Sequence, residues 1–398
     1  MTLPEILAHA EAICADSELR ALSRWKEQGG RVVGCAPAYV PTEIIDAAGA
    51  LPAHILGAGP SLEVVQGDAF FQSAICHLPR SLVELGQRGA LDALDLFVIP
   101  STCDVMRNLV GMWRLLFPDR PVRYLDLPQR FDAAGRAFYL EQLVELRGEI
   151  ERILDVRVRP DDMARSIALY NRRRRVIREL EDLRTRAPWQ VPTSEFVLVL
   201  RAGALITPRE HLTLLLDYRD ACRAVTRPVL DVARVVLTGA FCEQPPLGFI
   251  RTLERAGCAI VGDDLLLGMR WLLRDVREEG DPLEALADAY LHASPLAPSR
   301  FEGDERRPDA LLHAVRTRGA AGVILSSPSF CDPALLDRPH LLAGLEKAGI
   351  PSVQLQYAEN SADFGSVREQ AGTFADALRL WDTPTNESPN NVYARSAR

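Results

Sequence analysis

The sequence predicts an α/β protein in which two doubly wound parallel-sheet lobes flank a helical domain. Eight short apolar runs end in small or polar residues, and they fall into two groups of four. Helical patterns or compact connections separate the runs within each group, as in parallel sheets with crossover helices. Between the two groups, residues 133–228 show long helical periodicity without any strand-like run.

Each lobe is predicted from its four runs, which are rich in β-branched residues and bounded by Gly, Pro or Ser, a pattern typical of buried parallel strands. The first group comprises residues 31–37, 51–57, 94–104 and 122–128, and the second comprises residues 233–243, 257–264, 322–332 and 351–359. We therefore expect four segments: an N-terminal helix plus first α/β lobe over 1–132, a helical domain over 133–228, a second α/β lobe over 229–382 and a polar tail over 383–398.

The helical segment is predicted from two long patterns. Residues 134–154 place apolar side chains at helical spacing, with Glu and Arg on the opposite face. Pro160 followed by two aspartates is a typical helix start, and it leads into a second helical pattern over 163–183. The tail from Thr383 is polar and aperiodic, so we expect it to be disordered or bound to a partner.

Composition excludes several classes of function. The chain has 398 residues and a formal net charge of −8, which disfavours a basic nucleic-acid groove. No stretch approaches the roughly 20 apolar residues that span a bilayer. The N-terminus lacks the basic and apolar regions of a signal peptide, so we expect a cytoplasmic protein with no membrane partner.

The lysine count excludes one nucleotide site. The chain contains only Lys26 and Lys347, preceded by Trp25 and Glu346. A phosphate-binding P-loop needs the sequence Gly-Lys-Ser/Thr. We therefore expect no P-loop ATP site in this chain.

The eight cysteines point to metal chemistry, because disulfides are uncommon in cytoplasmic proteins. No Cys-x-x-Cys motif occurs, so a metal site would have to be assembled from distant segments. Four cysteines directly follow predicted strands and a fifth lies at a probable helix start: Cys35, Cys103, Cys242, Cys331 and Cys76. Ligands bind beyond the carboxyl ends of parallel strands, so this set favours a thiolate site. The alternative for each is a small buried hydrophobic residue.

Several motifs together resemble one known family. The segment GCAPAYVPTEIIDAAGALPAHILG (34–57) is similar to the N-terminal signature of the benzoyl-CoA reductase and 2-hydroxyacyl-CoA dehydratase family. The segments FQSAIC (71–76), STCD (101–104) and SFCD (329–332) fall where that family has its cluster cysteines. The resemblance runs in order from about residue 3 to about residue 380. The opening segment 1–13 and the block 364–378 favour the ATP-dependent reductase branch.

The resemblance implies two α/β lobes around a helical domain and one 4Fe-4S cluster per subunit. Its three thiolate ligands would be Cys76, Cys103 and Cys331. The family pattern does not require Cys35 or Cys242, although either could reach the same crevice. The fourth iron ligand is left open between water, a thiolate and substrate.

The resemblance also implies an activity: low-potential, one-electron reduction of the aromatic ring of benzoyl-CoA to a cyclic dienoyl-CoA, during anaerobic aromatic degradation. ATP and Mg would be used by partner subunits, the ATPase and electron-activating subunits (A and D). A homologous iron-sulfur subunit (B) and a low-potential ferredoxin donor complete the expected partners. The alternatives are a 2-hydroxyacyl-CoA dehydratase subunit, which removes water by a radical route, and an electron-relay or scaffold subunit without its own substrate site.

Three further residues are candidates for the chemistry. His77 and Glu43 are candidate proton donors by adjacency to the motifs, and Tyr39 is a candidate for the acyl pocket. The alternatives are an ordinary surface or core histidine, a first-turn helix acid and a packing aromatic. The run Arg172–Arg175 fits a solvated helix face paired with nearby acids, with CoA phosphates or a partner as the alternative.

Overall fold

The computed structural model describes residues 1–266, 269–270, 272–300 and 306–381, and all eight predicted strands are present. The first sheet contains β1 (Val32–Cys35), β2 (Leu51–His54), β3 (Leu96–Pro100) and β4 (Val122–Leu125) in the order β2-β1-β3-β4. The second contains β5 (Ala233–Thr238), β6 (Cys258–Asp263), β7 (Gly322–Pro328) and β8 (Ser352–Tyr357) in the order β6-β5-β7-β8. Every pairing is parallel, so the predicted fold class is confirmed.

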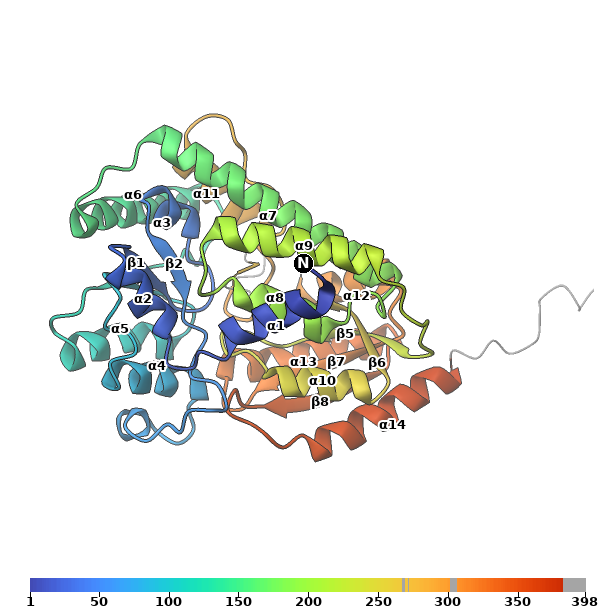
Figure 1. Cartoon of the computed structure of the whole chain (residues 1–398). Helices are drawn as coiled ribbons and strands as arrows, with labels where there is room; N and C mark the ends of the chain where they lie inside the picture. The colour runs from blue at the N-terminus through green and yellow to red at the C-terminus, as the bar shows by residue number, and fades with distance from the viewer. Residues whose placement is uncertain (267–268, 271, 301–305, 382–398) are drawn as a thin grey trace, which may run out of the picture.

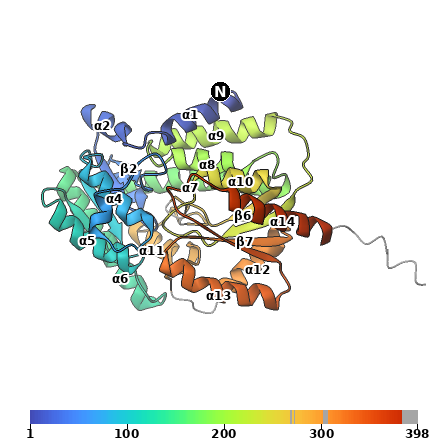
Figure 2. The same cartoon turned by 90° about the horizontal axis from the view of Figure 1, so that it is seen from below.

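Helices connect successive strands on both faces of each sheet. Around the first sheet lie α2 (Arg20–Glu27), α3 (Thr42–Ala47), the short 3₁₀ helix η1 (Gly67–Phe70), α4 (His77–Gln87) and α5 (Asp104–Leu116). Around the second lie α10 (Leu247–Arg255), α12 (Arg307–Arg318), α13 (Asp332–Lys347) and α14 (Gly365–Trp381). Figure 2 shows α12 and α13 on one side of the second sheet and α8 and α10 on the other.

The segment 133–228 folds into four helices: α6 (Ala133–Leu154), α7 (Pro160–Arg186), α8 (Thr193–Ala202) and α9 (Pro208–Ala224). They divide between two hydrophobic cores. α6 and the start of α7 pack with the first sheet, whereas the end of α7, α8 and α9 pack with the second. α7 therefore runs over both lobes (Figure 1). The domain borders at residues 132 and 228 stay a prediction.

Two helices pack far from their neighbours in the sequence. α1 (Leu3–Cys14) joins the core of the second lobe and lies beside α8 and α9 (Figure 1). α11 (Pro282–Ala293) follows β6 but contributes to the core of the first lobe, against α6. α1 and α11 therefore each pack against the lobe to which their neighbours in the sequence do not belong. The predicted polar tail, 383–398, lies outside the described residues.

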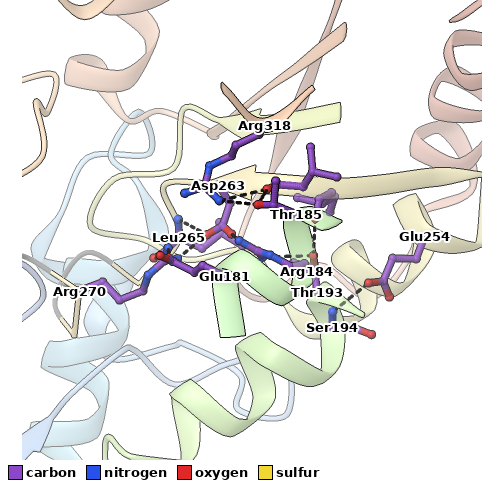
Figure 3. A network of polar contacts seen from close by, with 12 residues as sticks. Glu181, Arg184, Thr185, Thr193, Ser194, Glu254, Asp263, Leu265, Arg270 and Arg318 are labelled. Carbon is purple, nitrogen blue, oxygen red and sulfur yellow. Dashed lines mark hydrogen bonds and ion pairs between the residues drawn. The ribbon is translucent and has the colours of Figure 1, made fainter. Parts of the chain in front are cut away.

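A buried ion network fastens α7 to the second sheet (Figure 3). The carboxylate of Asp263, at the end of β6, lies 2.6 Å from a guanidinium nitrogen of Arg184 and 2.6 Å from one of Arg270. The side chains of Asp263 and Arg184 are fully buried. Burial by itself would raise the pKa of Asp263, but the charges of Arg270 and Arg184 outweigh it and hold that pKa below its ordinary value.

The predicted solvated face at Arg172–Arg175 is wrong for its two central residues. Arg173 is buried and contacts a ring nitrogen of His211 at 2.7 Å, and Arg174 forms an ion pair with Glu43 of α3. Tertiary packing places α7 between α3 and α9, so one turn of the helix has little contact with water. The side chain of Arg175 is half exposed and pairs with Asp275 at 2.6 Å.

Candidate functional site

The three predicted ligand cysteines occupy equivalent places in the fold. Cys76, Cys103 and Cys331 are the N-cap residues of α4, α5 and α13. Cys103 also follows β3, and Cys331 follows β7, so these thiols lie at the carboxyl ends of strands from different sheets. A helix N-terminus carries partial positive charge and free amide donors, which favour an anionic group.

The three thiols lie close to one another between the lobes. Burial raises the pKa of the Cys331 thiol to about 12, with Cys103 and Glu243 adding to the rise. Burial likewise raises the pKa of Cys76, and Cys331, Glu243 and Cys103 raise it further. Such mutual effects require close approach. The three thiols are thus near enough to interact electrostatically, and their role as metal ligands stays a prediction.

Backbone amides oppose part of the rise in the pKa of two of these thiols. Burial raises the pKa of the Cys103 thiol, but the amides of Met106 and Val105 in the first turn of α5 oppose the rise. The amide of Ala334 acts in the same way on Cys331. Charge on these sulfurs is thus met by hydrogen-bond donors of their own helices.

Cys242 joins the group and Cys35 does not. The sulfur of Cys242 lies 3.4 Å from the hydroxyl of Thr102, the residue before Cys103. The Cys35 sulfur instead contacts the carbonyl of Val33 on its own strand at 3.7 Å. Both cysteines follow predicted strands, so only the tertiary structure separates them.

Two carboxylates that the sequence analysis did not single out lie next to His77. The buried His77 places Nδ1 2.9 Å from Oε1 of Glu359, which also accepts the amide of Ala58 at 3.1 Å. Glu243 accepts the amides of Glu359 at 2.8 Å and of Leu78 at 3.1 Å through its two oxygens. Burial and the charge of Glu359 raise the pKa of Glu243 to about 7. Both acids follow predicted strands, the position that also singled out the cysteines.

The acid network borders two cavities. A cavity of about 200 Å³ is lined by His77, Arg80, Asp68 and Phe330, among others. A second, of about 450 Å³, has Glu359 and Arg201 in its wall. Phe330, which precedes Cys331, has a half-exposed side chain and a backbone φ of 60°. His77 therefore lies between Cys76, its neighbour in the sequence, and the smaller cavity.

Tyr39 lies on the Cys242 side of the thiol group. It is buried, its ring meets that of Tyr290 edge-on at 5.6 Å, and burial raises its pKa, with smaller contributions that include Cys242. Ala38 and Tyr39 have φ of 75° and 66°, a left-handed conformation that costs free energy in residues other than glycine. Strain of this kind is common at functional sites. The structure places Tyr39 near the thiols, and its role in an acyl pocket stays a prediction.

Glu43 is not part of this group. It lies in the first turn of α3, is fully buried and forms an ion pair with Arg174 of α7. This placement matches the alternative interpretation of a first-turn helix acid. Its proposed role as a proton donor stays a prediction.

The thiol group does not form a site for a single metal ion. Among the described residues, no three His, Cys, Asp or Glu side chains are arranged to hold one. A cluster differs from a single ion because its iron and sulfide atoms lie between the thiolates and hold them farther apart. The donor set, thiols alone at three helix N-termini, has the chemistry that iron-sulfur clusters use. No helix in the described part of the chain is long and apolar enough to cross a membrane.

The family model described as 2-hydroxyglutaryl-CoA dehydratase, D-component, matches residues 37–378. The chain belongs to this family. The resemblance carried by segment 34–57 and the cysteine motifs is thereby confirmed. The matched region begins after β1 and includes the other seven strands, together with Cys76, Cys103, Cys242 and Cys331.

Relatives of known activity fall in two branches of the family. The chain is 43% identical to the C component of benzoyl-CoA reductase from Thauera aromatica, over 96% of this chain and all of that protein. It is 29% identical to the beta subunit of (R)-2-hydroxyglutaryl-CoA dehydratase of Acidaminococcus fermentans, over 90% and 95% of the two chains. It is 26% identical to the beta subunit of lactoyl-CoA dehydratase of Anaerotignum propionicum, over 94% and 98%. The similarity is greater to the reductase, the branch that segments 1–13 and 364–378 favour.

Proposed function

We propose that this chain is an iron-sulfur subunit of a benzoyl-CoA reductase, an oxidoreductase that dearomatises benzoyl-CoA to a cyclic dienoyl-CoA by one-electron steps. The observation that carries the proposal is the 43% identity to a benzoyl-CoA reductase subunit over the full length of that protein. The thiol group between the lobes supplies a place for the cofactor that such chemistry needs.

We propose Cys76, Cys103 and Cys331 as ligands of a 4Fe-4S cluster, which when bound would supply electrons of very low potential. The residues present fit this cofactor. Three thiols converge from two sheets, and each has the N-terminus of a helix behind it to offset negative charge. Cys331 is buried and Cys76 and Cys103 are partly buried, which would limit the access of water and oxygen to the sulfur atoms.

Proton delivery is assigned to the acids beside the thiols. His77 would donate the proton, with Glu359 holding its ring at Nδ1 and Glu243 adjacent to both. The cavity of about 200 Å³ gives His77 contact with the outside of the site. Tyr39 would line the acyl pocket from the other side, next to Cys242.

The remaining parts of the reaction belong to partners. Lys26 forms an ion pair with Asp95, and neither of the two lysines stands in a P-loop sequence. We propose that the ATPase and electron-activating subunits (A and D) use ATP and Mg to drive electrons from a low-potential ferredoxin into a complex of this chain with its homologous iron-sulfur subunit (B). The complex would work in the cytoplasm of an anaerobically growing cell.

A dehydratase subunit is the second candidate, because the family model and two relatives carry that activity in their names. A reductase consumes electrons with every turnover, whereas a dehydratase returns its electron. ATP hydrolysed per molecule of product therefore separates the two. A fixed number of ATP molecules hydrolysed per molecule of product, with benzoyl-CoA as substrate, supports the reductase. Product formation with only occasional ATP hydrolysis supports the dehydratase.

The cofactor is tested on the anaerobically purified complex. Iron and acid-labile sulfide are measured, with electron paramagnetic resonance (EPR), for wild type, Cys76→Ser, Cys103→Ser and Cys331→Ser. Each variant should lack one cluster's iron, and Cys35→Ser should match wild type because the Cys35 sulfur contacts the carbonyl of Val33 on its own strand. Full iron content in all three ligand variants would refute a cluster in this chain and favour the scaffold alternative.

A further inference from the structure

Cys242 differs from the other cysteines that the family pattern leaves without a role. It follows β5, is 5% exposed, and belongs with Cys35 and Cys331 to a hydrophobic core against which Cys76 and Cys103 pack. Its sulfur lies 3.4 Å from the hydroxyl of Thr102, directly before Cys103. Cys242 is thus held at the thiol group from a fourth segment of the chain.

Structural cysteines elsewhere in the molecule have a different environment. The sulfurs of Cys14, Cys35 and Cys258 contact backbone carbonyls, those of Leu198, Val33 and Ala371, at 3.7 to 3.8 Å. This is the usual contact of a buried thiol that acts as a small hydrophobic residue with a weak donor. The sulfur of Cys242 instead contacts a hydroxyl group, that of Thr102, and interacts electrostatically with Cys103 and Cys331.

Each of the four thiols interacts electrostatically with the other three. Cys76 interacts electrostatically with Cys331, Cys103 and Cys242, and Cys242 interacts with Cys103 and Cys331. Cys103 and Cys331 supply the sixth pair. All six pairs that four thiols can form are therefore in range of one another, with the side chains coming from the starts of α4, α5 and α13 and from the segment after β5. With the sulfur of Cys242 3.4 Å from the hydroxyl of Thr102, the segment after β5 lies beside the segment that carries Cys103.

We propose that Cys242 is the fourth thiolate ligand of the 4Fe-4S cluster in this chain. The inference rests on the proposed function, since it assumes that the cluster binds here. Forming the fourth iron–sulfur bond removes the proton from the Cys242 thiol and releases it to water. The hydroxyl of Thr102 is placed to donate a hydrogen bond to the resulting thiolate, which would help to offset the added negative charge.

The proposal has a consequence for the division of labour in the complex. A cluster with four protein thiolates has no iron open to water or to a substrate oxygen. Electrons would then pass through this chain, and a substrate that needs an open iron would meet it in another subunit. A three-thiolate cluster would keep one exchangeable iron in this chain.

The test uses the anaerobically purified complex enriched in ⁵⁷Fe, with wild type, Cys242→Ala, Cys242→Ser and the matched control Cys35→Ala. Iron content, Mössbauer spectra and EPR are recorded before and after mild oxidation. Wild type and Cys35→Ala should keep their irons. Cys242→Ala should lose about one iron of four from this chain's cluster and give a three-iron EPR signal. Cys242→Ser should keep four irons with an altered EPR spectrum, because oxygen replaces sulfur at one iron.

Each other result overturns a defined claim. Conversion of wild type to the three-iron form to the same extent as Cys242→Ala would show that Cys242 is only a packing residue. Identical spectra for wild type and both Cys242 variants would show the same. Wild type with no cluster in this chain would refute the proposed function together with this inference. Partner subunits are unchanged throughout, so differences between variants report on this chain.

Discussion

The ion network around Asp263 allows a quantitative prediction of stability. In Asp263→Asn the side chain keeps its shape but loses its charge, and Arg184 remains fully buried without a counter-charge. Removing one partner of a buried ion pair costs about 3–5 kcal/mol of the free energy of unfolding. Arg270 keeps Glu181 as a second partner, so we expect a loss near the lower end, about 3 kcal/mol.

The pH dependence of the same residue has a definite sign. The pKa of Asp263 in the folded chain is held below its ordinary value of 3.8. Its stabilising contribution is therefore complete above pH 3.8 and is lost as the pH falls toward the lower folded-state pKa. Asp263→Asn should lack this acid-dependent part of the unfolding curve.

Urea unfolding followed by circular dichroism measures both effects. Asp231→Asn is the exposed control, because Asp231 is 86% exposed in its ion pair with Arg379, and it should change stability by less than about 1 kcal/mol. The double variant Arg184→Met, Asp263→Leu should recover most of the loss, since it leaves no unpaired charge at Arg184. A loss below about 1 kcal/mol in Asp263→Asn, or an equal loss in the exposed control, would refute the reasoning.

Three further predictions concern the site. Tyr39→Phe should leave the free energy of unfolding within about 1 kcal/mol of wild type, because the buried hydroxyl has no hydrogen-bond partner among the described residues. Tyr39→Ala should instead cost about 3–5 kcal/mol, and equal losses for the two variants in urea unfolding would contradict this. Because burial raises the pKa of Glu243 from 4.5 to about 7, the folded chain holds a proton that the unfolded chain has released, and stability without the cofactor should fall by about 3 kcal/mol between pH 4.5 and 7. Glu243→Gln should remove this pH dependence of the free energy of unfolding. Parallel pH profiles of stability for wild type and Glu243→Gln would contradict the prediction. Phe330→Gly should raise the free energy of unfolding by roughly 1 kcal/mol, because glycine adopts the left-handed backbone of residue 330 without strain; an unchanged or lower value in urea unfolding would contradict this.

Local pattern was enough to predict the eight strands and the two long helices. The β-branched runs bounded by Gly, Pro or Ser predicted eight strands, and helical periodicity predicted α6 and α7, because each signal lies within one stretch of chain. The same logic located Cys103 and Cys331 at strand ends. Family motifs added Cys76, whose place at a helix start was visible in the sequence.

The remaining features depend on contacts between distant segments, which no local pattern encodes. Cys35 and Cys242 both follow predicted strands, so the sequence gives no reason to distinguish them. Only the packing of the two lobes brings Cys242 to Thr102. The same meeting pairs His77 with Glu359, 282 residues later in the chain. The packing of α7 against α3 turned Arg174 from an expected surface residue into the partner of Glu43. Sequence alone therefore determined which residues form strands and helices, whereas the tertiary structure decided which of their side chains meet, because burial and charge pairing arise only when the lobes pack together.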